Sequence, residues 1–293
     1  MTEAWTQWPA PAKLNLFLHI VGRRDDGYHL LQTIFQLLDW GDCVRLRPRS
    51  DGAIARSGDT ASIAAQNDLC LRAAAALKQR SGSPLGADID LRKSIPIGAG
   101  LGGGSSDAAT VLVGLNEIWA AGLGIDELAT IGASLGADVP VFIRGHSAWA
   151  EGIGERLTAV ALPEREYVIV DPCVAVSTSL LFQAPELTRN SPPTTISGYL
   201  SGSVASGSGA GAMNAFEPIA RARYPQVAAA LDWLGRFGVA RLTGSGGCVF
   251  VEVESAQRGE EILGLCPAQF AAYRARGVPR SPLLDAVERF RRR

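Results

Sequence analysis

The chain has 293 residues, of which 47% are hydrophobic and 19% are charged, and its formal net charge at pH 7 is −1. A chain of this length can bury a sizeable core and is long enough for two lobes. The near-zero charge and the lack of long basic runs outside the tail 289–293 argue against nucleic acid or a membrane surface as partner, so we expect a small-molecule ligand.

The sequence contains no recognisable targeting or membrane-spanning segment. Residues 1–13 lack a continuous apolar stretch, and no apolar run approaches the length that crosses a bilayer. The five cysteines are scattered without a C-x-x-C pair, and the three histidines lack metal-ligand spacing. We therefore expect a cytoplasmic protein with reduced thiols and no metal held in a cage of protein ligands.

The opening part of the chain is predicted to be rich in strands. The first strand covers residues 14–21, and further strand-like runs cover 32–38 and 43–47. Lys13 and Asn15 fall on the face of the first strand opposite its apolar residues. Those apolar residues, which are expected to share one face, are Leu14, Leu16, Leu18 and Ile20.

A helix with an alanine-rich interior is predicted over residues 67–80, and a strand over residues 88–95 follows. This strand alternates polar and apolar residues, which is typical of a half-exposed strand in an antiparallel or mixed sheet. It ends at Pro96, where a glycine-rich segment begins. Residues 96–107 read Pro-Ile-Gly-Ala-Gly-Leu-Gly-Gly-Gly-Ser-Ser-Asp.

The glycine-rich segment leads directly into a predicted helix, which starts at about Ser105 to Asp107 and ends near Gly122 or Gly124. Glycines let the backbone approach a ligand at positive φ, and the first helical turn offers unpaired N–H groups and a partial positive charge. We therefore predict a phosphate-binding loop rather than a flexible linker. The apolar residues that define the helix are Val111, Leu112, Leu115, Ile118 and Trp119.

Two common phosphate-binding loops do not fit this segment. A Walker A loop requires lysine directly after its last glycine, whereas two serines follow here. The segment does satisfy G-x-G-x-x-G, but the dinucleotide fingerprint needs a buried strand leading into its first glycine, and the alternating strand broken by Pro96 does not supply one. A nicotinamide-dependent oxidoreductase is therefore a minor alternative, and a non-catalytic nucleotide-binding module is another.

The remaining sequence mixes helices and strands without strict alternation, which favours an α+β fold. We expect two lobes, residues 1–160 and 161–293, that meet near residues 151–163. The later predicted elements are a helix over 126–135, an apolar run over 136–143, a strand over 167–170, a mobile Gly/Ser/Ala-rich surface loop over 201–212, a helix over 226–237, and strands over 240–243 and 248–253 around a second glycine cluster.

Lys13 and Asp138 are polar residues in apolar surroundings and are candidates for catalysis. Taken singly, a lysine at the start of a strand is most often solvated, and an aspartate where a helix gives way to an apolar run is most often a turn or capping residue. Phosphoryl transfer to a hydroxyl, however, needs a carboxylate for the proton and a cation at the transferring group. Asp138 is the expected base, and Lys13, if adjacent, also holds it ionised.

Several motifs, spread from position 8 to about position 283, resemble those of the GHMP kinase superfamily in order and spacing. The resemblance implies two α+β lobes with the active site in the cleft between them, and ATP-dependent phosphorylation of an alcohol with Mg²⁺ bound together with ATP. The motifs are Pro-Ala-Lys-Leu-Asn-Leu (11–16) with Asp-Gly-Tyr-His (26–29), the loop 96–106, Gly-Ala-Asp-Val-Pro (136–140) and Leu-Thr-Gly-Ser-Gly (242–246).

The same resemblance implies roles for individual residues, with Lys13 and Asp138 as the catalytic pair. It implies an acceptor that carries a cytosine nucleotide, with Asn15 beside the alcohol and His29 hydrogen-bonded to the base. Two aromatic rings stack on that base, those of Tyr28 and Phe182. The ATP-binding residues that it implies are Lys93, Pro96, Ile97, Gly98, Ala99, Gly100, Leu101, Gly102, Gly103, Gly104, Ser105 and Ser106.

A sister kinase acting on homoserine, mevalonate or a sugar is the main alternative. The tyrosine–histidine pair at 28–29 argues against it, because a bare alcohol needs no base pocket. Two positions depart from the family pattern: Asp68 separates Asn67 from Leu69, and no acidic residue directly follows Asn214. Neither position touches the catalytic pair. The oligomeric state is not indicated by the sequence, which is compatible with a monomer or a weak homodimer.

Overall fold

The computed structural model describes residues 4–59, 63–201 and 213–292. Within these residues ten strands join one mixed sheet of order β3-β4-β2-β10-β7-β9-β8, with β1 and β5 paired to β2 and β6 paired to β5. The fold is therefore α+β, as predicted.

The strands are β1 (Thr6–Arg23), β2 (His29–Arg49), β3 (Ile54–Gly58), β4 (Gly86–Arg92), β5 (Ala148–Glu151), β6 (Arg156–Ala159), β7 (Glu166–Asp171), β8 (Arg241–Leu242), β9 (Val249–Val253) and β10 (Ala271–Val278). The helices are α1 (Leu69–Ser81), α2 (Gly103–Ile118), α3 (Ile125–Leu135), α4 (Val139–Arg144), α5 (Thr178–Gln183), α6 (Ile196–Leu200), α7 (Glu217–Arg223), α8 (Pro225–Leu234), α9 (Ala256–Gly264) and α10 (Pro282–Arg291).

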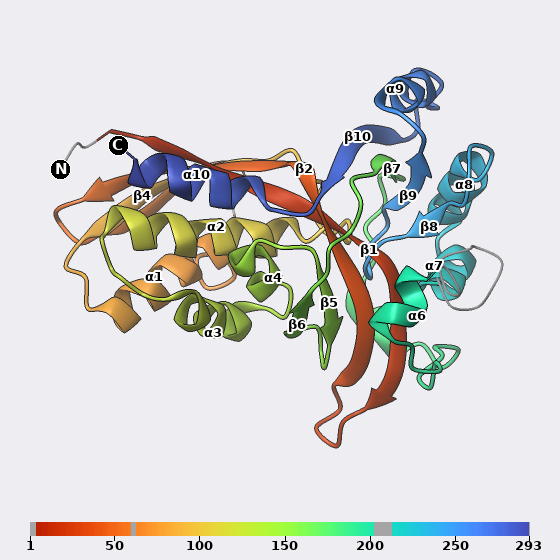
Figure 1. Ribbon diagram of the computed structural model, residues 1–293, viewed down its shortest axis with the longest axis horizontal. Helices are drawn as coiled ribbons and strands as arrows, with labels where there is room; N and C mark the ends of the chain where they lie inside the picture. The colour runs from red at the N-terminus through yellow and green to blue at the C-terminus, as the bar shows by residue number, and fades with distance from the viewer. Residues whose placement is uncertain (1–3, 60–62, 202–212, 293) are drawn as a thin grey trace.

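The long strands β1 and β2 run through both halves of the molecule (Figure 1). The two predicted runs 32–38 and 43–47 are parts of the single strand β2. The prediction of one shared apolar face on β1 is wrong, because the register shifts between Asn15 and Leu18. Leu14 and Leu16 pack in one hydrophobic cluster, whereas Leu18 and Ile20 pack in another together with β7 and β9.

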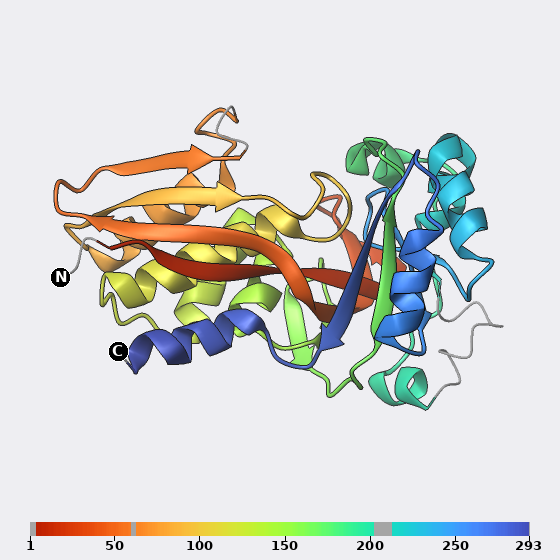
Figure 2. The same ribbon diagram turned by 90° about the horizontal axis from the view of Figure 1, so that it is seen from above.

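Helices α1, α2, α3 and α4 cover one face of β1, β2 and β4 and form the first lobe (Figure 1). The central helix α2 is buried along almost all of its length. Helix α10 from the other end of the chain belongs to the same core, which contains its residues Leu283, Ala286 and Val287. The first and last described residues consequently lie at the same end of the molecule (Figure 2).

The second lobe is built on β7, β8 and β9, with α7, α8 and α9 packed around them. Strand β10 joins the two lobes, since residues 271–276 pair with β7 and Gly277 and Val278 pair with β2. The alternation predicted for residues 88–95 is confirmed within β4, where Ile89 and Leu91 are buried and Asp90 is half-buried beside Arg45 of β2, but the strand ends at Arg92 rather than at Pro96.

Helix α2 differs from its predicted bounds at both ends. It begins at Gly103, because Gly102 adopts a left-handed N-cap conformation with φ +74°. It ends at Ile118, because the Asn116 side chain ties itself to both backbone groups of Leu123 and closes the turn. Of the predicted loop 201–212, residues 202–212 lie outside the described part of the chain. Among the described helices, none is long and apolar enough to cross a membrane.

Candidate active site

The glycine-rich segment forms a loop that ends at the N-terminus of α2. Gly98, Gly100 and Gly102 have φ values of +72°, +80° and +74°, which glycine adopts without strain. No side chain caps α2, so the N–H groups of its first turn stay available to a ligand. A cavity of about 300 Å³ lies over the loop, lined by Pro96 through Ser105 together with Ile63, Leu69, Lys93 and Asp107.

The second glycine cluster packs directly on this loop. A Cβ atom on Gly100 would lie 2.2 Å from the carbonyl oxygen of Thr243, and one on Gly246 would lie 2.1 Å from the amide nitrogen of Gly100. The two backbones are therefore too close for any side chain. The Asn214 amide donates hydrogen bonds of 3.0 Å and 2.7 Å to the carbonyls of Leu242 and Gly244 and fixes the cluster.

Lys13 is buried rather than solvated, with only 3% of its side chain exposed. Its Nζ donates a 2.9 Å hydrogen bond to the carbonyl of Gly100 and another to Oδ1 of Asn15, and it lies 5.4 Å from the centre of the Phe35 ring. Burial lowers the pKa of Lys13, while the charge and hydrogen bond of Asp138 oppose that effect. The ammonium group is thus held at the inner end of the glycine loop.

Asp138 stands at the N-cap position of α4, yet its side chain makes no capping hydrogen bond. Its Oδ2 instead lies 3.5 Å from Nζ of Lys13, and a third of the side chain is exposed. Both residues line a central cavity of about 310 Å³. Because Thr178, Phe216 and Ser245 line the same cavity, it lies between the two lobes.

Asn15 lines the same cavity and fixes the position of Lys13. Its Oδ1 accepts from Lys13, and its Nδ2 donates a 2.9 Å hydrogen bond to Oγ1 of Thr33. Its backbone N–H donates to Oγ1 of Thr243, at 3.0 Å. Since both ends of the amide are engaged, its orientation is determined by its neighbours.

Tyr28, His29 and Phe182 line a third cavity, of about 810 Å³. Tyr28 is 60% exposed, and the His29 and Phe182 rings lie 5.0 Å apart. This cavity adjoins the central one, because four residues line both. They are Leu31, Ala137, Ile153 and Phe182. Gly100, Gly102 and Ser105 in turn line both the central cavity and the glycine-loop cavity. The three cavities therefore form one continuous site with Lys13 and Asp138 in the middle.

Comparison with known proteins identifies the family. The GHMP kinases N terminal domain matches residues 68–146, and the GHMP kinases C terminal domain matches residues 202–271. A 4-diphosphocytidyl-2-C-methyl-D-erythritol kinase from Xanthomonas campestris pv. campestris is 53% identical over 97% of this chain and 95% of its own length. The chain belongs to the GHMP kinases. A second relative of the same name, from Azoarcus sp., is 51% identical over 96% of each chain.

Solved structures of GHMP kinases have the same fold. A crystal structure of 4-(cytidine 5'-diphospho)-2C-methyl-D-erythritol kinase matches with a TM-score of 0.81 and 33% identity, over 93% of this chain and 100% of that one. A mevalonate kinase matches with a TM-score of 0.67 and 16% identity, over 94% and 99%, which shows a common fold alone. The two-lobed GHMP kinase fold expected from the sequence motifs is confirmed.

The structure of this GHMP kinase reveals a carboxylate pair that the sequence did not suggest. Nζ of Lys93 donates to Oδ2 of Asp42 and, at 2.8 Å, to Oδ2 of Asp107. Asp42 also accepts from the backbone N–H groups of Ser94 and Ile95. Burial raises the pKa of Asp107 to about 7; the charge of Lys93 opposes this rise, and the neighbouring carboxylate of Asp42 adds to it. These three residues come from distant segments, so no local pattern in the sequence predicts that they meet.

Two buried oxygens at the start of α2 have no protein partner. Ser106 Oγ and Asp107 Oδ1 are inaccessible to solvent and accept no hydrogen bond from the described residues. The Asp68 carboxylate, by contrast, has protein partners: it caps the N-terminus of α1 and forms a buried 3.0 Å ion pair with Arg56. Asp68 is not among the residues that line the glycine-loop cavity.

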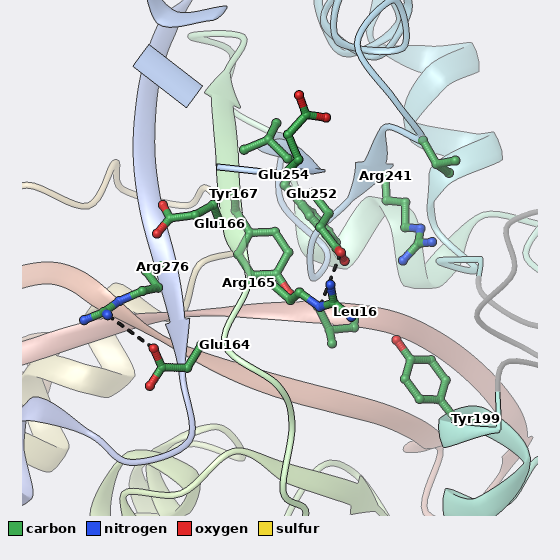
Figure 3. Close-up of a pocket in the computed structure, with 13 residues that line it drawn as sticks. Leu16, Glu164, Arg165, Glu166, Tyr167, Tyr199, Arg241, Glu252, Glu254 and Arg276 are labelled. Atoms are coloured by element: carbon green, nitrogen blue, oxygen red, sulfur yellow. Dashed lines mark hydrogen bonds and ion pairs between the residues drawn. The ribbon is translucent and has the colours of Figure 1, made fainter. Parts of the chain in front are cut away.

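A separate cavity of about 650 Å³ lies on another part of the kinase, between β7, β9 and α6 (Figure 3). Its charged side chains include the ion pairs Arg165–Glu252 and Arg276–Glu164. Leu16 reaches this cavity from β1, but none of the predicted site residues lines it. All of the predicted site residues except Ser106 line the cavities of the interlobe site, and Ser106 is fully buried at the start of α2.

Proposed function

We propose that this kinase transfers the γ-phosphoryl group of ATP to the 2-hydroxyl of 4-diphosphocytidyl-2-C-methyl-D-erythritol, a step of non-mevalonate isoprenoid precursor biosynthesis. The observation that carries the proposal is the position of Lys13 and Asp138, between the glycine-loop cavity and the cavity of Tyr28, His29 and Phe182. The names of relatives more than 50% identical over nearly the whole chain support this substrate. The free thiols agree with a cytoplasmic enzyme.

ATP occupies the glycine-loop cavity in this proposal, with its phosphates against the loop from Pro96 to Ser106. The uncapped first turn of α2 supplies N–H donors and a partial positive charge to the phosphates. Ile63, Leu69 and Ile97 supply apolar surface along the same cavity for the adenine. Lys93 at its edge is held by two carboxylates, so its position is fixed before the nucleotide arrives.

Ser106 Oγ and Asp107 Oδ1 fit a magnesium ion that arrives with ATP, because both are buried oxygens without a protein partner. The described residues contain no group of three or more His, Cys, Asp or Glu side chains that could hold a metal ion by themselves. A shared site with the nucleotide phosphates is therefore the arrangement that these residues favour. Bound there, Mg²⁺ offsets phosphate charge.

Asp138 acts as the base in this mechanism and accepts the proton of the acceptor hydroxyl. Its side chain is free of capping bonds and one-third exposed to the central cavity, so it can receive a substrate hydroxyl. Lys13 lies 3.5 Å from Asp138 and presents a positive charge where the transferring phosphoryl group becomes more charged. Asn15 holds the lysine and faces the erythritol part of the acceptor.

The third cavity takes the cytosine, which stacks between Tyr28 and Phe182 and hydrogen-bonds to His29. A pyrimidine presents two π-faces and a polar edge, and two aromatic rings with one imidazole match that pattern. A kinase for homoserine, mevalonate or a simple sugar has no use for these groups.

The test is an ADP-release assay in which ATP is offered with 4-diphosphocytidyl-2-C-methyl-D-erythritol, homoserine, mevalonate and galactose in parallel. We expect ADP release only with the cytidylyl substrate, and a phosphorus NMR spectrum of the product with a new phosphate monoester. Turnover of only one of the other acceptors would show that the chain is a GHMP kinase with that substrate instead. No turnover of any acceptor would overturn the kinase assignment.

A further inference from the structure

Arg189 lies in the segment after α5 and holds the edge of the cytosine-side cavity through four directed hydrogen bonds. Its Nη2 donates to the carbonyls of Phe182 at 3.0 Å and Ala184 at 2.9 Å, and its Nη1 donates to the carbonyl of Leu187 at 3.1 Å. Its Nε donates to Nε2 of His29, at 3.2 Å. Three of the five guanidinium N–H groups thus donate to carbonyls and fix the plane, and the Nε–H group donates to the histidine.

This contact determines the protonation of His29. A guanidinium group carries only donors and stays charged, so the atom that receives its N–H must offer a lone pair. Nε2 of His29 therefore carries no proton, and the neutral ring carries its single proton on Nδ1. The ring of Phe182, 5.0 Å away, packs beside the imidazole and restricts its rotation.

The charges around His29 favour the same neutral form. Burial lowers the pKa of His29, and the positive charges of Arg189 and Arg23 lower it further. Arg23 approaches from β1, paired with His29 across the β1–β2 ladder, and Arg189 approaches from the segment after α5. Asp26, in the turn between the two strands, lines the same cavity and ion-pairs with Arg24.

We propose that Arg189 is a positioning residue that makes His29 an Nδ1–H donor, and that this tautomer selects cytosine over uracil. The inference rests on the proposed function and adds the origin of its base specificity. Cytosine presents a lone pair at N3, which the Nδ1–H group can bond. Uracil carries a hydrogen at N3, so a donor would face a donor and both would lose their partner.

The decisive measurement on the ring is the ¹⁵N chemical shift of His29 in the unmodified protein without substrate. The chain has three histidines, and a His29→Gln variant assigns the signal by its absence. We expect a protonated Nδ1 and an unprotonated Nε2 at pH 7. A protonated Nε2 would overturn the proposal, and this readout is independent of whether the kinase reaction occurs.

The functional measurement compares kcat/KM for the cytidylyl substrate and for its uridylyl analogue. We expect the unmodified kinase to prefer cytosine by about 10²-fold or more, since a mismatched buried hydrogen bond is strongly rejected. Arg189→Met removes all guanidinium donors at similar length and should lose at least about tenfold of that preference, with Nε2–H appearing in the ¹⁵N spectrum.

Arg23→Met is the matched control. It removes a positive charge from the same cavity but leaves the bond between Arg189 and His29 in place. We expect it to retain the base preference and the Nδ1–H tautomer. Equal preference for both bases in the unmodified kinase, or an unchanged preference in a folded Arg189→Met variant, would refute the role of Arg189. If that variant does not fold, the ¹⁵N spectrum of the unmodified protein still shows which nitrogen of His29 carries the proton, and so tests the proposal.

Discussion

Nζ of the buried Lys13 lies 3.5 Å from Oδ2 of Asp138, although the two residues belong to β1 and to the N-cap of α4. The lysine is 3% exposed and the aspartate 33%, so the pair has an inner cation and an outer base. Burial lowers the pKa of Lys13 and the aspartate counteracts it. Asp138 therefore offsets the cost of burying the lysine charge, and its removal leaves that charge uncompensated.

Asp138→Asn should lower kcat by about 10² or more, because it removes the base that accepts the hydroxyl proton. The amide also leaves Lys13 without its counter-charge, which lowers the pKa of the lysine further. Steady-state kinetics would show the loss in kcat, and calorimetric titration should show ATP affinity close to that of the unmodified kinase. Near-normal turnover would contradict the assignment of Asp138 as base.

Tyr28→Ala should mainly raise KM for the cytidylyl substrate and leave kcat and thermal stability nearly unchanged. The ring is 60% exposed and lies in the turn before β2, so its loss removes a stacking surface but little core packing. Tyr28→Phe is the control, since it keeps the ring and should keep KM. An unchanged KM in the alanine variant would mean that the cytosine binds elsewhere.

The sequence predicted the residues that carry local signals. The glycine segment and the helix after it were recognisable because φ freedom and helical spacing are local properties, and the motif at Asp138 was readable for the same reason. The α+β class followed from the mixture of strand and helix patterns. The positions of α2 and β4 were predicted within a few residues for these reasons.

Other features arise only when distant segments meet, and no local pattern of residues predicts them. Asp42, Lys93 and Asp107 come from β2, the segment after β4, and α2. Arg189 donates to His29 from a segment 160 positions further along the chain. The shift between Asn15 and Leu18 in β1 is a bulge, which alternation of residue types does not reveal.

Gly100→Ala should disrupt the nucleotide site, whereas Gly98→Ala should be tolerated better. Both glycines have positive φ, so both substitutions carry a backbone strain of about 1 kcal/mol. Only at Gly100 does the new Cβ collide with backbone, 2.2 Å from the carbonyl of Thr243; at Gly98 nothing lies within 4 Å. We expect Gly100→Ala to raise the KM for ATP more, and to lower Tm more, than Gly98→Ala does. Equal effects of the two substitutions would show that the close contact between Gly100 and Thr243 does not matter for nucleotide binding.

Asp107 should make the unliganded kinase less stable as pH rises. Burial raises its pKa to about 7, above the value of about 4 in an unfolded chain, so between these pH values the folded state binds more protons. The free energy of unfolding contributed by this group is fully present near pH 4 and is lost as the pH rises through 7. Asp107→Asn, which mimics the protonated acid, should flatten that decline in urea titrations at pH 5 and pH 8.

Asp42→Asn is the comparison for this pH effect. Asp42 accepts from two backbone N–H groups and from Lys93, so its loss should destabilise the kinase at both pH values. If Asp107→Asn followed the pH slope of the unmodified protein, the raised pKa of Asp107 would be contradicted.

Leu283→Ala should destabilise the whole first lobe, although residue 283 belongs to the C-terminal helix α10. Leu283 is fully buried in the cluster that contains α1, α2 and β1, and truncating such a leucine costs about 2–5 kcal/mol. Leu265→Ala, at a leucine that is 61% exposed, should change the free energy of unfolding by less than about 0.5 kcal/mol. Urea unfolding followed by circular dichroism measures both. A small effect at Leu283 would mean that α10 docks loosely on the first lobe and adds little to its core.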